Sequence, residues 1–316
     1  MRLVDAHAHV QADRFAGDLP AVLDSAVAAG IERLLVPGWD LASSRDAIAL
    51  AARAGGEPAA ATSARAGGET AAPAADAAVA SGRPERLPID AAVGIHPHEA
   101  ARADPADWDA VCALAAGPIV RAIGETGLDY DRAFSPREVQ LANLRRHLAL
   151  GRETGKPVIL HCRSAVGRRD AQDDLIAELR AAGIPDPVWT ARLAGRPPAI
   201  LHSFSGPVDY AEAALELGLA IGFSGLVFRT GEEASAEVVR LVPVGRLLAE
   251  TDSPYLSPPG APRRRNEPAW VRITAAWIAE RRGDDPDVLG DVLVAAYDAT
   301  FGPPSRDGAD VMRAGR

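Results

Sequence analysis

Residues 156–165 read KPVILHCRSA, and residues 198–206 read PAILHSFSG. In each stretch a short apolar, β-branched run of the kind found in buried strands ends at a histidine, His161 in the first and His202 in the second. Between them, residues 171–182 form an amphipathic, Ala- and Leu-rich pattern that predicts a helix. Two strands joined by a helix predict a parallel sheet in which both strands end at the same edge.

The same alternation runs through most of the chain. The expected strands are residues 2–6, 33–37, 91–95, 120–124, 157–160, 198–201, 220–223 and 247–250. Helical patterns at 19–29, 136–154, 171–182 and 208–217 lie between them. Eight strands that alternate with helices predict a single-domain (β/α)8 TIM barrel of the α/β class. An open doubly wound sheet is the alternative, and it is disfavoured because no GxGxxG turn follows the first strand.

One segment departs from this rhythm. Residues 51–82 consist mainly of Ala, Gly and polar residues, and they include a short tandem duplication, ARAGGEPAA at 52–60 and ARAGGETAA at 64–72. Such a segment buries too little apolar surface to offset the entropy of ordering it. We therefore expect a barrel domain over residues 1–302 with a disordered or loosely helical Ala/Gly-rich insertion at 51–82, followed by a flexible tail at 303–316.

Composition narrows the class of protein. The 316 residues are 47% hydrophobic and 24% charged, as in ordinary globular proteins, and no stretch approaches the roughly 18 apolar residues of a membrane span. Two cysteines and the absence of a leader-like N-terminus favour a cytoplasmic protein. The net charge of −9 argues against a protein that coats nucleic acid by broad electrostatics. Nothing in the sequence indicates an obligate protein partner.

Most of the histidines follow an expected strand. Six of the seven lie at such positions: His7, His9, His96, His98, His161 and His202. The acidic residues Glu125 and Asp252 also follow expected strands. Because the C-terminal ends of barrel strands meet at one mouth, side chains far apart in the sequence should meet in one pocket there.

Taken singly, each of these residues has an ordinary explanation. An HxH pair such as His7 and His9 is a weak signal, Glu125 could cap a helix, and Asp252 could belong to a turn. Taken together, histidines and carboxylates at strand ends predict a site for two divalent metal ions. Imidazole-rich ligation suits zinc, while the carboxylates also allow manganese or magnesium.

The chain's only lysine helps to assign the ligands. Many barrel metallohydrolases bridge two ions with a carbamylated lysine after the fourth strand, but Lys156 precedes the fifth strand, at the opposite end of the barrel. Glu125 occupies the position after the fourth strand and is the candidate bridge. We expect His7, His9 and Asp252 to hold one ion and His161 and His202 to hold the other. Glu125 and Asp252 are the candidate catalytic residues, with Asp252 accepting a proton from water.

Four further residues are candidate substrate contacts. His96 and His98 in IHPH lie beside the expected mouth, with a purely structural loop as the alternative. Arg163 is placed to hold a phosphate or carboxylate, although a structural ion pair would explain it equally well. Arg265 ends the basic run 263–265, which could contact a phosphate backbone or form a solvated loop.

The motifs resemble those of the TatD family of metal-dependent hydrolases in the amidohydrolase superfamily. The matching stretches are DAHAHV at 5–10, VGIHPHEA at 93–100, AIGETGLDYDR at 122–132, KPVILHCRSA at 156–165, ILHSFSG at 200–206, GFSG at 222–225, ETDSPYLSP at 250–258 and RRNEPAW at 264–270. This resemblance implies a barrel with one or two ions and metal-dependent DNase activity. It also implies ligands at the positions named above. The insertion at 51–82, the long segment 184–196 and Asp298, where the family usually carries Asn, depart from the family pattern.

Three functions remain open at this point. The first is cleavage of phosphodiester bonds in DNA by a metal-activated water. The second is hydrolysis of a small amide, ester or aminoacyl substrate at the same two-metal site. The third is a binding protein with a decayed site, which is disfavoured because every ligand position is retained.

Overall fold

The computed structural model describes residues 1–55, 87–262 and 264–304. Eight parallel strands form one sheet in the order of the sequence. They are β1 (Leu3–Asp5), β2 (Ile31–Pro37), β3 (Ile89–Val93), β4 (Val120–Asp129), β5 (Val158–Arg163), β6 (Ala199–Leu201), β7 (Ala220–Phe223) and β8 (Leu247–Ala249). This confirms the predicted (β/α)8 barrel.

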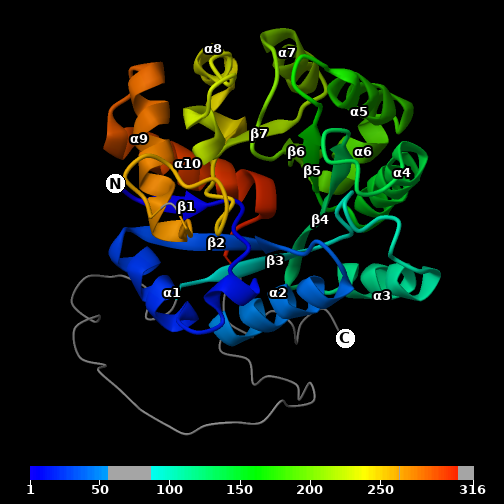
Figure 1. Cartoon of the computed structure of the whole chain (residues 1–316), viewed down its shortest axis with the longest axis horizontal. Helices are drawn as coiled ribbons and strands as arrows, with labels where there is room; N and C mark the ends of the chain where they lie inside the picture. Colours follow the sequence, from blue (N-terminus) through cyan, green and yellow to red (C-terminus); the bar gives the residue numbers. More distant parts are fainter. Residues whose placement is uncertain (56–86, 263, 305–316) are drawn as a thin grey trace, which may run out of the picture.

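Helices surround the strands (Figure 1). Among the described residues the α-helices are α1 (Leu19–Ala28), α2 (Leu41–Ala54), α3 (Pro105–Ala115), α4 (Arg137–Thr154), α5 (Asp170–Ala181), α6 (Pro187–Leu193), α7 (Val208–Glu216), α8 (Ser235–Leu241), α9 (Val271–Arg282) and α10 (Pro286–Phe301). The four helices expected from periodicity, now α1, α4, α5 and α7, end within one residue of their predicted bounds. Apolar faces of helices and strands form a common core, as burial of the amphipathic faces requires.

The barrel closes where β1 meets β8. The amide of Ala6 donates to the carbonyl of Ala249 at 3.1 Å, and the amide of His9 donates to the carbonyl of Ser253 at 2.7 Å. An isolated parallel bridge joins Ala8 to Ser253. The first and last strands are thus held together at the end of the barrel where the predicted ligands lie.

Two strands extend beyond their predicted C-terminal ends. β4 continues to Asp129 and β5 to Arg163, so Glu125 and His161 lie within strands rather than after them. The register of the β4–β5 pair shifts between Ile123 and Thr126 and then continues through Asp129. This irregularity, which is invisible in the apolar pattern, lets the pair extend into the mouth.

The expected insertion begins later than predicted. Residues 51–54 form the last turn of α2, and Ala51 is buried against the core, so this turn belongs to the barrel and not to the insertion. The alanines here continue the apolar face of the helix. The rest of the insertion from residue 56, and the predicted tail from residue 305, lie outside the described residues.

The opposite end of the barrel carries structural polar contacts. Lys156 donates through Nζ to the carbonyls of Ala115 and Gly117 at 2.5 and 2.7 Å, which confirms its place away from the mouth. Arg33 pairs with both Asp90 and Asp298. Asp298, the departure from the family pattern, therefore neutralises a buried arginine. No helix within the described ranges is long and apolar enough to cross a membrane.

Candidate metal centre

The six predicted ligands come together at the C-terminal end of the strands. His7 and His9 follow β1, Glu125 lies in β4, His161 in β5, His202 follows β6 and Asp252 follows β8. All except His161 and Asp252 are almost fully buried. A buried cluster of imidazoles and carboxylates is costly unless its members are paired or coordinate a cation.

Four side chains surround a first position. The Nε2 atoms of His7 and His9 lie 3.1 Å apart. Oε2 of Glu125 lies 3.3 Å from His7 Nε2 and 3.5 Å from His9 Nε2. Oδ1 of Asp252 lies 3.8 Å from His7 Nε2 and 3.4 Å from His9 Nε2. Two imidazole nitrogens and two carboxylate oxygens thus converge.

The other carboxylate oxygen of Glu125 faces a second set. Its Oε1 lies 3.1 Å from Nδ1 of His161 and 3.3 Å from Nε2 of His202. The two oxygens of one carboxylate therefore point at two different groups of imidazoles, as a side chain bridging two ions must do.

These distances fit a divalent ion. Ligands about 2.0–2.1 Å from a shared tetrahedral ion stand roughly 3.3 Å from one another, and the distances above range from 3.1 to 3.8 Å. Imidazole and carboxylate are also the donors that zinc and manganese prefer. The residues present therefore fit the two-ion prediction in geometry and in chemistry.

Glu125 is charged in this environment. Burial by itself raises the pKa of its carboxyl, but the surrounding imidazoles of His202, His96 and His161 outweigh that effect and hold the pKa well below its usual value. A carboxylate that stays ionised at all working pH values is suited to lie between two cations.

Two carboxylates that the sequence analysis did not assign to the site hold the imidazoles of the second set. Glu250 is buried and accepts a hydrogen bond from Nδ1 of His202 at 3.1 Å and another from the amide of Ser203. Asp129 lies 3.3 Å from Nε2 of His161 through its Oδ2. His202 thus presents Nε2 to Glu125, while His161 presents Nδ1. Such carboxylate–histidine pairs fix the tautomer and orientation of a metal ligand.

One of these residues had a signal in the sequence. Glu250 ends an apolar strand two residues before Asp252, and an acidic residue at the end of a buried strand needs a partner. Asp129 is the last residue of β4, four residues past Glu125.

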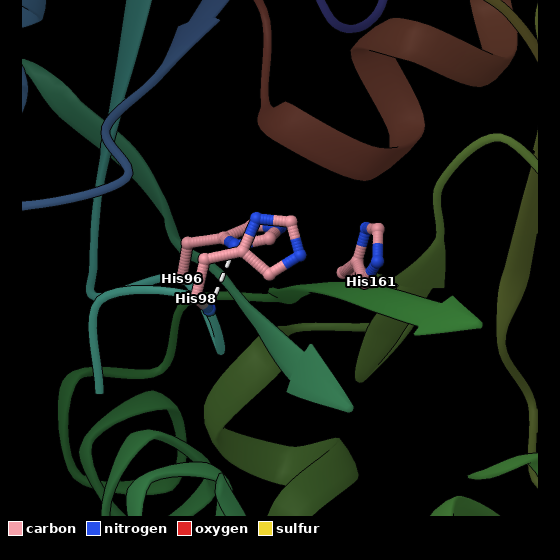
Figure 2. A group of neighbouring side chains, drawn as sticks. All are labelled: His96, His98 and His161. Carbon is pink, nitrogen blue, oxygen red and sulfur yellow. Dashed lines mark hydrogen bonds between the residues drawn. The ribbon is translucent and has the colours of Figure 1, made fainter. Parts of the chain in front are cut away.

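His96 and His98 lie next to this set, on the segment after β3 (Figure 2). The amide of His98 donates to Nδ1 of His96 at 3.1 Å, the bond dashed in Figure 2, so the ring proton of His96 resides on Nε2. That nitrogen lies 3.3 Å from Oε1 of Glu125. Burial lowers the pKa of His96 to about 4, so the ring is neutral and acts as an N–H donor.

This tautomer decides between two roles. The rings of His96, His98 and His161 are close enough to hold an ion together. A ligand nitrogen must offer a lone pair, however, and Nε2 of His96 carries the proton. Nε2 of His98 is meanwhile 2.7 Å from Oδ2 of Asp129. We therefore interpret His96 as a hydrogen-bond donor facing the ion site, not as a ligand.

The two arginines predicted to contact substrate are each paired within the protein. Arg163 is exposed and donates through Nε to Asp131 at 2.7 Å. Arg265 donates to both oxygens of Asp18 and to Glu267 at 2.7 to 2.8 Å. Residue 263 of the same basic run lies outside the described residues. A substrate phosphate would have to compete with these carboxylates, and the role of both arginines stays a prediction.

Comparison with known proteins gives a consistent answer. The family model for TatD related DNase matches residues 4–302. The 3′-5′ ssDNA/RNA exonuclease TatD of Enterobacter lignolyticus is 35% identical over 293 residues, covering 91% of this chain and 94% of that protein. The metal-dependent hydrolase YabD of Bacillus subtilis is 31% identical over 278 residues, covering 88% and 90%.

A solved structure gives the same result. The crystal structure of the TatD homologue YJJV from Escherichia coli superposes with a TM-score of 0.75 at 25% sequence identity, covering 96% of this chain and 99% of that one. The family match over residues 4–302 extends from β1 to the end of α10 and spans all six predicted ligands. The chain therefore belongs to the TatD family of metal-dependent hydrolases.

Proposed function

We propose that this chain is a two-metal nuclease that cleaves phosphodiester bonds in DNA. Its preferred substrate would be single-stranded nucleic acid. The observation that carries the two-metal part is Glu125, whose Oε2 faces His7 and His9 while its Oε1 faces His161 and His202. The substrate class is supported by relatives named as 3′-5′ ssDNA/RNA exonucleases.

The ions would supply the central chemistry. Divalent cations bound at these positions lower the pKa of a coordinated water and stabilise charge on phosphate oxygens. Imidazole-rich ligation favours zinc, while the carboxylates also allow manganese or magnesium, so the assay below compares all three ions.

The protein's own side chains would then move protons and position the substrate. Asp252 uses Oδ1 towards His7 and His9, and its second oxygen would accept the proton of the attacking water. His96 would donate its Nε2 hydrogen to a phosphate oxygen, because a neutral N–H donor stabilises charge without releasing its proton. His98, held by Asp129, would contact the same substrate. Arg163 and Arg265 remain proposed phosphate contacts further out.

The direct test is an assay of the purified chain. Protein stripped with a chelator and reloaded with Mn²⁺, Mg²⁺ or Zn²⁺ is incubated with end-labelled single-stranded DNA, single-stranded RNA and duplex DNA. We expect metal-dependent shortening of single strands from the 3′ end and loss of activity in Glu125→Gln.

The alternative substrates belong in the same experiment. A panel of small amides, esters and aminoacyl compounds is tested under identical conditions. Metal-loaded protein that hydrolyses one of these and leaves nucleic acid intact would overturn the proposal in favour of a small-molecule hydrolase. Our proposal includes a cytoplasmic location, which fractionation of cells would check.

A further inference from the structure

Aromatic residues make up only 5% of the chain, yet several surround the metal centre. The ring of Phe134 lies 4.8 Å from that of His98, and the ring of Tyr255 lies 6.1 Å from that of His9. Trp39 also lies beside His9, at 5.3 Å. All three contacts are edge-to-face.

Exposure separates Phe134 and Tyr255 from the other aromatic residues. Their side chains are 65% and 53% exposed. The other exposed large hydrophobic residues in the described part of the chain are Met1, Val166, Val188, Leu241, Val244 and Val288. Single exposed aliphatic residues are ordinary on protein surfaces. The two exposed aromatic rings, in contrast, both lie against a histidine of the metal centre.

The two rings stand on opposite walls of the barrel. Phe134 follows β4 and Tyr255 follows β8, and these strands are four positions apart in the order of the eight-stranded sheet. The metal centre lies between them, because His98 contacts Asp129 at the end of β4 while His9 contacts Asp252 after β8. A ligand lying across the ions would meet an aromatic ring on either side.

The charge of the protein limits how it can hold a nucleic acid. With a net charge of −9, long-range attraction does not favour a polyanion, and affinity has to come from short-range contacts. Stacking of unpaired bases on aromatic rings is such a contact, and it is independent of sequence. The guanidinium of Arg14, 6.0 Å from the centre of the Tyr255 ring, adds one positive charge beside that platform.

We propose that Phe134 and Tyr255 are stacking platforms for unpaired nucleobases on the two sides of the phosphate that is cleaved. This inference rests on the proposed function and adds that the protein recognises the unpaired bases of its substrate. Bases in a duplex are stacked on their own neighbours and cannot offer a free face. The platforms would therefore select single strands, and they would do so through the bases and not through the backbone.

The test compares protein variants with matched substrates. The variants are Phe134→Ala and Tyr255→Ala, with Phe134→Trp and Tyr255→Phe as ring-preserving controls and Val288→Ala as an exposed apolar control on α10. The substrates are an end-labelled oligothymidylate and the same strand with a single abasic nucleotide at each position near the 3′ end. KM and kcat are measured for every combination, and bound metal is measured for every variant.

We expect Phe134→Ala and Tyr255→Ala to raise the KM for intact oligothymidylate about tenfold or more, with unchanged metal content. In the wild type, an abasic nucleotide at one position should raise the KM about as much as Phe134→Ala does. The same abasic strand should cause no further increase in the KM of Phe134→Ala. An abasic nucleotide at a different position should have this relationship to Tyr255→Ala. Phe134→Trp and Tyr255→Phe, which keep a ring, should keep the difference in KM between intact and abasic strands, and Val288→Ala should resemble the wild type.

Equal KM values for the wild type and both alanine variants on intact strands would overturn the platforms while leaving the nuclease proposal in place. Wild-type protein that cleaves no nucleic acid would overturn the proposed function instead. In that event fluorescence anisotropy of the same oligonucleotides with metal-loaded protein still tests the platforms. Binding by the wild type that both alanine variants weaken supports them, and equal or absent binding refutes them.

Discussion

The backbone amide of Asp252 donates a hydrogen bond to the carbonyl of His7 at 2.8 Å. His7 follows β1 and Asp252 follows β8, and both side chains face the first predicted ion position. The same seam is fixed by Asp5, whose carboxylate accepts from the amide and hydroxyl of Thr251 at 2.9 and 2.6 Å. The contacts that close the barrel therefore also fix the positions of His7 and Asp252, two of the predicted ligands of the first ion.

Metal removal should weaken the fold for this reason. A ligand that binds only the folded state stabilises it by about 2.7 kcal/mol at a hundred times its dissociation constant. We expect chelated protein to unfold at lower denaturant concentration than protein with saturating Mn²⁺ or Zn²⁺, and His7→Ala to lose most of this difference. Denaturant titration followed by circular dichroism measures it. Coincident curves with and without metal would contradict the coupling.

Glu125→Gln should uncouple the two ion positions. Glutamine keeps the size of the side chain but removes the charge between the cations, and one unit charge about 4 Å away contributes about 4 kcal/mol at an effective dielectric constant near 20. We expect affinity for one ion to fall by roughly two to three orders of magnitude, and turnover with it. Calorimetric metal titration measures this. Glu232→Gln, at a half-buried glutamate that hydrogen-bonds Ser205, is the control.

Glu250→Gln and Asp129→Asn should act on the second ion alone. Each removes the charge that orients one imidazole of that set, His202 in the first case and His161 in the second. Losing such a partner typically costs about 10- to 100-fold in metal affinity. The absorption of Co²⁺ depends on its ligands, so a titration with Co²⁺ can follow the two sites separately. It should show a lower affinity at the His161/His202 site and an unchanged affinity at the His7/His9 site. A loss confined to the first site would refute the assignment.

His96→Phe should reduce turnover while both ions remain bound. The ring of His96 is locked as an Nε2–H donor by the amide of His98, and phenylalanine keeps its volume without the donor. Loss of one such donor typically costs about 10²–10³ in kcat. Elemental analysis distinguishes this outcome from that of a ligand, because loss of an ion from His96→Phe would show that the residue coordinates metal.

His147 should make the protein sensitive to acid. It lies in α4, and its ring accepts from the amide of Ile95 at 2.9 Å and donates to the carbonyl of Asn143 at 2.7 Å, so it is buried in the neutral form. Burial lowers its pKa to about 3, from 6.5 in the unfolded chain. Between these values the unfolded chain binds more protons. The stabilising contribution is thus fully present above about pH 6.5 and is lost as the pH falls towards 3.

His147→Gln removes this titration. The slope of unfolding free energy against pH should decrease by up to about 1.4 kcal/mol per pH unit in the window from 3 to 6.5. The slopes come from denaturant titrations of the wild type and His147→Gln at several pH values, both after metal has been removed with a chelator. Parallel slopes for wild type and variant would show that His147 does not titrate in this way.

Much of the site could be predicted because the barrel converts sequence position into spatial position. An apolar run that ends in His161 or His202 marks where the buried part of a strand ends, and all parallel strands point to the same mouth. The same logic placed Lys156 at the far end, where it binds backbone carbonyls. Placing these residues at one end of the barrel or the other requires only the order and the period of the apolar residues, and no knowledge of contacts.

Only the tertiary structure could decide which groups pair at that mouth. The register shift in β4 carries Asp129 to His161, and the packing of β6 to β8 sets Glu250 beside His202, but no local pattern encodes either pairing. Arg163 and Arg265 meet Asp131 and Asp18 for the same reason. Period and order in a sequence report which face of an element is buried. Pairing depends on distances between elements, which exist only once the whole chain has packed.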